Sequence, residues 1–255
     1  MKKIVILYFS GAGSARKVAE IIYNSIKDKS DADIFPFEEA GGIDLNQYDG
    51  IVIGTPVYHA APAKLVMKFF SAAAPMERPT PAFIYNTRAT WSCNTNRILA
   101  KHILSCNIFT VLDRDYRSPA SDGSLIVPFV QRFFEFDRQL ARKVRLDSRL
   151  FLKKITNSAK GYVPRFRFSS IINAPNKLAG QLITFNIHTH KNRCRKCGTC
   201  VKNCPHSAMG RDAEGYAKFI PAKCENCYRC IHHCPAKALS LSKRRAPDKL
   251  LDFDI

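Results

Sequence analysis

The first half of the chain alternates short apolar runs with amphipathic stretches. Five runs rich in β-branched residues read as strands buried on both faces, as expected in a parallel sheet. They lie at residues 3–9, 32–37, 49–58, 81–87 and 107–113. Apolar residues recur at helical spacing after the first run, over 63–74 and over 95–105. Strands that alternate with helices in this way predict a doubly wound α/β domain with a five-stranded parallel sheet.

A glycine-rich turn follows the first strand and leads into the first helix. Its six residues, 10–15, read SGAGSA. Backbone N–H groups at such a turn and at the helix N-terminus converge on one spot, where they favour a phosphate. A glycine-rich turn can also be no more than a tight connection, so the turn alone leaves both interpretations open.

Ligands of a parallel α/β sheet bind beyond the carboxyl ends of its strands, near the point where the strand order reverses. In this chain those ends are residues 10–15, 55–58 and 86–93. With FSGAGSARKVAE followed by GTPVY, the chain resembles the short-chain flavodoxin family, whose fold binds FMN. The resemblance implies that the first loop holds the phosphate and that the other two contact the flavin ring. The residues implied are Ser10, Gly11, Ala12, Gly13, Ser14, Ala15, Thr55, Pro56, Val57, Tyr58, Asn86, Thr87 and Trp91.

The phosphate loop departs from the S/T-G-T-G-N-T pattern of that family. Ala12 and Ala15 stand where hydroxyl groups are usual, and Ser14 stands in place of Asn. A hydrogen bond to a charged group contributes about 1.5–3 kcal/mol, so the loss of two is expected to weaken FMN binding. Tyr58 and Trp91 are the aromatic residues positioned for stacking, although packing at a strand end is an alternative for Trp91. A functional FMN site and an empty or weakly loaded domain both stay open.

A duplicated cysteine motif occupies residues 194–235. The pattern C-x2-C-x2-C-x3-C-P occurs there twice, thirty residues apart. Three thiolates of such a run bind one iron–sulfur cubane, and the fourth, followed by a chain-turning Pro, binds the other. The predicted [4Fe–4S] ligand sets are Cys194, Cys197, Cys200 and Cys234 for one cluster, and Cys224, Cys227, Cys230 and Cys204 for the second. Zinc is a poorer fit, because zinc sites typically use two separated C-x2-C pairs and not two runs of four Cys that end in Cys-Pro. Disulfides are also a poorer fit, because they require an oxidising compartment and nothing in the sequence directs export.

The remaining composition sets expectations for location and surface. The other two cysteines, Cys93 and Cys106, have no ligand spacing around them and are expected to be buried thiols.

No apolar run approaches the roughly 18 residues of a membrane helix, and the apolar start reads as a strand, so a cytoplasmic protein is expected. The formal net charge is +19. Such a basic chain implies an acidic redox protein or an anionic membrane surface as partner; nucleic acid is disfavoured because no nucleic-acid-binding motif accompanies the charge.

A basic amphipathic pattern runs over residues 129–155. It predicts one long helix with Phe133, Phe136, Leu140 and Val144 on one side and Arg or Lys on the other. The start of this helix is expected to close the first domain, and the remainder to form an extension. Such a stretch can lie on a membrane surface, but it more commonly packs its apolar face onto its own domains while the charged groups stay in water.

Together the two parts resemble the flavodoxin–ferredoxin fusion proteins of anaerobic bacteria and archaea. The predicted domains are a flavodoxin-like domain at 1–150, a basic linker at 151–184, and a small α+β ferredoxin domain at 185–255 with motifs at 185–214 and 215–244. The resemblance implies FMN, two [4Fe–4S] clusters and an electron relay that serves an external redox partner. An electron carrier is favoured over a substrate-specific oxidoreductase, because no residue is required as acid, base or nucleophile. Two alternatives stay open: a ferredoxin-linked flavin reductase acting on a small molecule, and a cluster-bearing sensor or adaptor with a non-functional flavin site.

Overall fold

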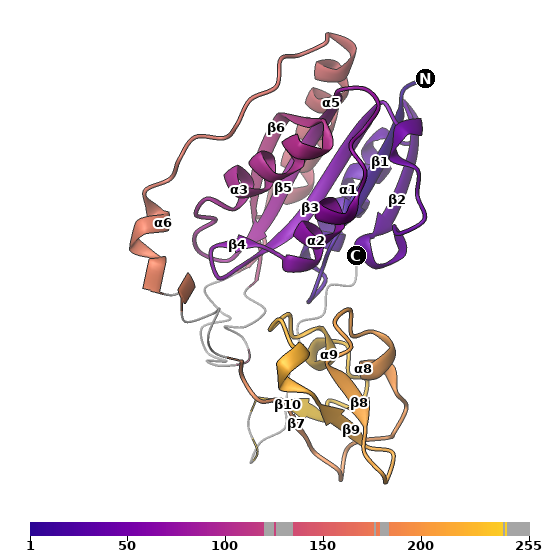
Figure 1. The fold of residues 1–255 in the computed structure, drawn as a ribbon, viewed down its shortest axis with the longest axis vertical. Coiled ribbons are helices and arrows are strands. Elements are labelled where there is room, and N and C mark those ends of the chain that lie inside the picture. Colours follow the sequence, from indigo (N-terminus) through magenta and orange to yellow (C-terminus); the bar gives the residue numbers. More distant parts are fainter. Residues whose placement is uncertain (120–124, 126–134, 176, 179–183, 242, 244–255) are drawn as a thin grey trace.

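The computed structural model describes residues 1–119, 125, 135–175, 177–178, 184–241 and 243. A larger α/β part contains the N-terminus, and a smaller part made by the chain after residue 184 lies beyond one end of its sheet (Figure 1). Among the described residues, no helix has the length and apolar character needed to cross a bilayer.

The α/β part is organised around a sheet with the strand order β2-β1-β3-β5-β6. Its strands are β1 (Lys3–Tyr8), β2 (Asp31–Pro36), β3 (Gly50–Tyr58), β5 (Thr80–Arg88) and β6 (Ile108–Arg117), all parallel, with a short β4 (Ala61–Pro62) antiparallel to β3. In this register Ile6 pairs with Ile34 on one side and with Val52 on the other. The order reverses at β1 and β3, which confirms the predicted doubly wound sheet.

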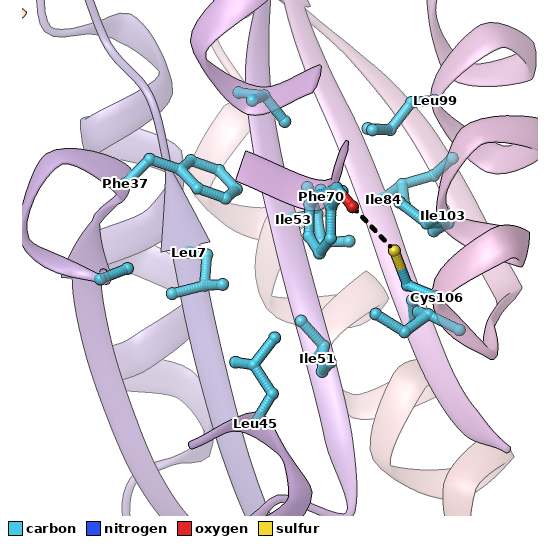
Figure 2. Packing of buried hydrophobic residues seen from close by; sticks show 14 of the residues in the cluster. Leu7, Phe37, Leu45, Ile51, Ile53, Phe70, Ile84, Leu99, Ile103 and Cys106 are labelled. Carbon is cyan, nitrogen blue, oxygen red and sulfur yellow. Dashed lines mark hydrogen bonds between the residues drawn. The ribbon is translucent and has the colours of Figure 1, made fainter. Parts of the chain in front are cut away.

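Helices cover both faces of the sheet. They are α1 (Ser14–Ile26), α2 (Lys64–Ala72), α3 (Thr95–Ile103) and α5 (Leu140–Thr156), with a short α6 (Ser169–Ile172) and the 3-10 helices η1 (Phe37–Glu39), η2 (Leu45–Gln47) and η3 (Leu104–Cys106). Helices α1 and α5 pack on one face, where Ile22 and Phe151 belong to one buried cluster. Helices α2 and α3 pack on the other, where the Cys106 thiol donates a hydrogen bond to the Phe70 carbonyl oxygen at 3.0 Å (Figure 2). Cys93 and Cys106 are both buried, as predicted.

The amphipathic stretch after the sheet folds differently from the predicted long helix. Helix α5 begins only at Leu140. Just before it, the Asp137 carboxylate accepts a hydrogen bond from the Gln139 backbone N–H at 2.9 Å, so a local turn replaces helix there. Residues 129–134 of the predicted helix lie outside the described residues. The later half is also no extension, because Phe151 is fully buried against α1 and the sheet and α5 completes the helical layer.

The segment after α5 is attached to the α/β part. Arg97 on α3 donates a hydrogen bond to the Pro164 carbonyl oxygen at 2.8 Å. The backbone N–H of Arg167 donates to Asn94 Oδ1 at 2.8 Å, and its guanidinium pairs with Asp115 on β6. These contacts fix this part of the predicted linker against the ends of β5 and β6.

The smaller part consists of two similar halves. Its elements are β7 (His188–Thr189), α8 (Thr199–Lys202), β8 (Met209–Arg211), β9 (Ala217–Phe219), η5 (Pro221–Lys223), α9 (Arg229–His232) and β10 (Leu239–Ser240), with β7 antiparallel to β10 and β8 to β9. In the first half, Ala208 N–H donates to Cys204 Sγ at 3.1 Å. Thirty residues later, Ala238 N–H donates to Cys234 Sγ at 3.3 Å. The repeated bond agrees with the internal duplication expected from the sequence.

Candidate functional site

A cavity of about 120 Å³ lies beyond the carboxyl ends of β1, β3 and β5. Its place is where a doubly wound sheet binds ligands. Ten of the thirteen predicted flavin-site residues line it: Ser10, Gly11, Ala12, Ser14, Ala15, Pro56, Val57, Tyr58, Thr87 and Trp91. We call it the flavin cavity.

The other three predicted residues, Gly13, Thr55 and Asn86, do not line it. Gly13 immediately precedes α1. The Thr55 hydroxyl accepts a hydrogen bond from the Ala63 backbone N–H at 3.0 Å, and Thr55 is fully buried. The Asn86 side chain is also fully buried, and its Nδ2 donates to Asn96 Oδ1 at 2.9 Å. Thr55 and Asn86 therefore hold the strand ends in place, and their contact with a flavin stays a prediction.

The loop from Ser10 to Ala15, which we call the phosphate loop, fits an anion. Gly13 has a φ of 105°, a conformation that favours glycine. The first turn of a helix leaves N–H groups without helical partners, and these attract negative charge. No acidic residue stands in the first turn of α1. The Ser10 hydroxyl accepts a hydrogen bond from Gly13 N–H at 3.1 Å and keeps its own O–H as a donor, and Ser10 and Ser14 both line the flavin cavity. The loop therefore offers two serine hydroxyls besides its backbone N–H groups.

The flavin cavity also has wall residues outside the thirteen that the sequence analysis named. They are His59, Ala60, Arg88, Ala89, Thr90, Cys93, Ser118, Pro119 and Asn173. The Cys93 thiol donates to the Ser169 carbonyl oxygen at 3.6 Å, and burial raises the pKa of this thiol. Arg88, Ala89, Thr90 and Cys93 lie within the strand end at residues 86–93 that the sequence identified, although none of them was named as a contact. Asn173 comes from the segment after α5, which no sequence pattern connects with the strand ends.

The eight motif cysteines gather around two separate cavities. One, the distal quartet, consists of Cys194, Cys197, Cys200 and Cys234. The other, the proximal quartet, consists of Cys204, Cys224, Cys227 and Cys230. In both, the fourth cysteine of one motif joins three from the other, which is the crossed arrangement that the spacing predicts. Within the part of the chain that the structure describes, no three potential ligands are arranged for a single metal ion.

The sulfur environment fits thiolate ligands of an iron–sulfur core. The Asn226 backbone N–H donates to Cys224 Sγ at 3.4 Å. Burial raises the pKa of Cys227 to about 12, and burial with the neighbouring cysteines raises the pKa of Cys230. Thiolates crowded into such a buried site need positive charge beside them, which iron would supply. The residues present therefore fit one cubane in each quartet.

The two quartets differ in exposure. Cys227 and Cys230 of the proximal quartet are buried, whereas Cys197 of the distal quartet is exposed. A hydrogen bond from the Thr199 hydroxyl lowers the pKa of Cys197, with a smaller contribution from the charge of Arg211. The distal quartet thus borders solvent, and the proximal quartet is the more buried of the two.

The proximal quartet abuts the phosphate loop. Cys227 belongs to the buried apolar cluster of the sheet, and its carbonyl oxygen would lie 2.4 Å from a Cβ built on Gly11. Arg229 on α9 donates to the Ser10 carbonyl oxygen from Nη2 at 2.8 Å and from Nε at 3.1 Å. The same guanidinium pairs with Glu38 in η1. The flavin cavity and the proximal quartet therefore share a wall.

Several solved structures are similar to the α/β part. A flavodoxin from the domain Archaea is 15% identical, covers 60% of this chain and 99% of its own, and has a TM-score of 0.46. A Streptococcus pneumoniae TIGR4 flavodoxin is 11% identical with the same coverage and a TM-score of 0.47. Two-electron reduced Megasphaera elsdenii flavodoxin is 19% identical, covers 44% of this chain and 84% of its own, and has a TM-score of 0.40. Among curated proteins, none matches the chain.

Two domain families match the sequence itself. The flavodoxin domain family matches residues 5–99, which contain most of β1, the phosphate loop and β2 to β5. The 4Fe-4S dicluster domain family matches residues 193–238, which contain both cysteine quartets. The chain therefore joins a flavodoxin domain to a 4Fe-4S dicluster domain, and is a flavodoxin–ferredoxin fusion.

Proposed function

We propose that this chain is an electron carrier in which two [4Fe–4S] clusters and one FMN exchange electrons within a single molecule. The flavodoxin and 4Fe-4S domains support an electron-transfer role. In the proposal, each cysteine quartet holds one cluster and the flavin cavity holds FMN. When bound, each cluster carries one electron at a time, and FMN takes up two with protons from water.

The close approach of Cys227 to Gly11 carries this proposal. The Cys227 carbonyl oxygen is so near Gly11 that a Cβ there would lie only 2.4 Å from it. Cys227 is a predicted ligand of the proximal quartet, and Gly11 lines the flavin cavity. Electron transfer slows steeply as donor and acceptor move apart. A shared wall therefore favours direct transfer between the two sites over transfer through a diffusing shuttle.

The distal quartet is the proposed contact point for an external partner. Its Cys197 is exposed, and Arg195, Lys196 and Arg211 line the same cavity. Basic groups around an exposed redox site select an acidic partner and accelerate its approach at low salt. We therefore propose an acidic redox protein as the partner. Electrons would pass between partner and FMN through the distal and then the proximal quartet.

The geometry of the flavin cavity also favours one second function, reduction of a small molecule at the flavin. Tyr58 and Trp91 both line the cavity, and Trp91 is 56% exposed. A planar substrate stacked near such a half-exposed aromatic could reach the flavin without a protein partner. Consumption of a small acceptor by reduced protein alone would favour this function over the carrier. Absence of FMN binding at micromolar concentration would instead favour a sensor or adaptor.

Anaerobic purification tests the proposal most directly. The chain is expected to contain about eight iron and eight sulfide, with flavin and cluster absorbance in the same spectrum. Rapid mixing with a reduced acidic ferredoxin should bleach cluster absorbance first and flavin absorbance after it. Cys197→Ala should retain FMN but reduce it more slowly, while Cys106→Ala, a buried cysteine outside both quartets, should match the wild type. Colourless or zinc-loaded protein, or flavin reduction that Cys197→Ala leaves unchanged, would contradict the relay.

A further inference from the structure

The phosphate loop depends on its backbone shape. Ala12 and Ala15 have no polar group, so the donors of the loop are the hydroxyls of Ser10 and Ser14 and the backbone N–H groups. Anion binding by backbone N–H groups requires that these groups converge on one point. Whatever holds the backbone of this loop in place therefore contributes directly to binding of the phosphate.

The 4Fe-4S domain supplies one such support through Arg229. Its guanidinium donates to the Ser10 carbonyl oxygen at 2.8 and 3.1 Å, so these hydrogen bonds hold the start of the loop. It also pairs with Glu38 and lies 5.1 Å from the centre of the Phe9 ring. The side chains of Arg229 and Glu38 are only 16% and 20% exposed. Shielded charge-assisted bonds are among the stronger hydrogen bonds in proteins.

A second support is the backbone of Cys227. A Cβ at Gly11 would lie 2.3 Å from Tyr58 Oη and 2.4 Å from the Cys227 carbonyl oxygen, so the loop and this carbonyl are in direct contact. Arg229 lies between Cys227 and Cys230, and all three line the cavity of the proximal quartet. Iron bound by the two cysteines would fix the positions of both supports.

We propose that Arg229 is a positioning residue for the FMN site, so that FMN binding and iron binding by the proximal quartet stabilise each other. Coupling between two binding sites is reciprocal: if iron strengthens FMN binding, FMN must strengthen retention of iron by the same factor. This inference rests on the proposed FMN site but not on electron transfer between the cofactors.

Anaerobic FMN titration of the full chain, followed by quenching of flavin fluorescence, tests the coupling. Arg229→Gln should raise the Kd for FMN about tenfold or more, the loss expected for a charge-assisted bond. Glu38→Gln, which loosens Arg229 without changing the 4Fe-4S domain, should weaken FMN binding in the same direction. Lys68→Gln is the matched control, because Lys68 pairs with Glu225 across the same domain boundary but is exposed and, within the described residues, forms no hydrogen bond or ion pair with the phosphate loop. The Kd of this variant for FMN should equal that of the wild type.

Iron release to a chelator gives the reciprocal measurement. Saturating FMN should slow release from the wild type, and should slow it less in Glu38→Gln. The inference would be overturned if Arg229→Gln and Glu38→Gln both bound FMN with wild-type affinity. It would also be overturned if FMN did not change the rate at which the wild type releases iron. A wild type that binds no FMN would overturn both the inference and the proposed function. FMN that binds cooperatively with iron but is not reduced by the clusters would leave the inference standing and remove the relay.

A separate surface beside the flavin cavity presents apolar side chains to solvent. Phe168, Ile171 and Ile172 are 75%, 61% and 71% exposed. The Phe166 and Phe168 rings contact each other edge to face at 5.7 Å. Nearby, Asn173 and the exposed Trp91 line the flavin cavity. We call Trp91, Phe166, Phe168, Ile171 and Ile172 the apolar patch.

Hydrogen bonds and an ion pair hold the backbone beneath the apolar patch, so the exposure of its side chains belongs to the folded structure. Arg167 is bound through its backbone N–H to Asn94 and through its guanidinium to Asp115, while Ser169 accepts from the Cys93 thiol. These bonds direct the neighbouring Phe166 and Phe168 outward. Contiguous exposed apolar side chains mark interaction surfaces.

The charge around the apolar patch points to an anionic lipid surface as its occupant. The sequence contains no Asp or Glu from residue 148 to residue 211, whereas Lys160, Arg165 and Lys177 lie within ten residues of the patch segment 166–172 along the chain. Aromatic and aliphatic side chains together with basic groups are the combination that binds the interface of an anionic membrane. We infer that this face rests on such a membrane, which brings the mouth of the flavin cavity close to the lipid.

Sedimentation with vesicles tests this second inference. The loaded chain should sediment with vesicles of phosphatidylcholine and phosphatidylglycerol, less with phosphatidylcholine alone, and less at high salt. The combined variant Phe168→Ser, Ile171→Ser and Ile172→Ser should lose most of this binding. Leu146→Ser removes a comparably exposed side chain from α5, away from the patch, and should bind as the wild type does. No binding by the wild type, or equal binding by the combined variant, would overturn the inference and leave a protein as the occupant.

Discussion

Arg229 donates two hydrogen bonds to the carbonyl oxygen of Ser10, although 219 positions separate the two residues in the chain. Ser10 begins the phosphate loop, and Arg229 lies between two cysteines of the proximal quartet. Hydrogen bonds to charged groups contribute about 1.5–3 kcal/mol, so this single side chain stabilises the contact between the domains measurably. The two domains are thus joined at the flavin cavity itself, and not only through the long segment that connects them in sequence.

The crossed ligand sets can be tested by paired cysteine variants. Cys234→Ala, although it lies in the second motif, should lose the distal cluster, retain about four iron and four sulfide, and bind FMN normally. Cys204→Ala, although it lies in the first motif, should lose the proximal cluster and weaken FMN binding. Iron and sulfide analysis together with FMN titration distinguishes the two. If Cys234→Ala weakens FMN binding and Cys204→Ala does not, the quartets are assigned the wrong way round.

A methyl group at Gly11 should separate the domains locally. In Gly11→Ala the new Cβ would lie 2.3 Å from Tyr58 Oη and 2.4 Å from the Cys227 carbonyl oxygen. The tyrosine side chain can rotate away, but the backbone carbonyl of Cys227, a predicted cluster ligand, cannot move without disturbing the proximal quartet. FMN affinity should therefore fall, and iron should be released faster to a chelator.

The control for this variant is Gly42→Ala, because a Cβ at Gly42 meets no atom within 4 Å. It should leave FMN affinity and iron release unchanged. Gly11→Ala protein with wild-type FMN affinity and wild-type iron release would show that the phosphate loop and the Cys227 backbone can move apart without consequence.

The sequence was sufficient for features that depend on local periodicity and spacing. Buried β-branched runs such as the one containing Ile51, Val52 and Ile53 predicted the central strand correctly, because a strand covered on both faces must be apolar throughout. The cysteine spacing predicted two groups of four that exchange their last member. Both features are determined by contacts within a few residues or by a repeated ligand rule.

Features that depend on long-range contacts were not predictable in the same way. The break before α5 depends on a turn at Asp137 that competes with helix, and the apolar periodicity continues across it. Asn173 reaches the flavin cavity only because Arg167 and neighbouring residues attach the segment to the strand ends. Arg229 looks like one more basic residue of a cysteine motif, since nothing near it in sequence reveals that Ser10 and Glu38 lie beside it.

Trp91 should report directly on the flavin cavity. It is the single tryptophan of the chain and lines the cavity, so FMN binding should quench its fluorescence. Aromatic contacts contribute about 0.5–1.5 kcal/mol beyond buried area, so Trp91→Ala should raise the Kd for FMN roughly two- to tenfold. Trp91→Phe should retain most of the affinity. Binding of FMN without any change in tryptophan emission would mean that FMN occupies a different site.

The packing of α5 can be tested by truncation of one buried side chain. Phe151 is fully buried and contacts Phe83 on β5 with ring centres 5.7 Å apart. Phe151→Ala should lower the free energy of unfolding of the α/β part by about 3–5 kcal/mol, because the cavity left behind cannot refill. Leu146→Ala, at an exposed position of the same helix, should change it by no more than about 0.5 kcal/mol. Urea unfolding followed by far-ultraviolet circular dichroism measures both. If Phe151→Ala is as stable as Leu146→Ala, then α5 is a peripheral extension, as the amphipathic pattern alone suggested, and the α/β core is complete without it.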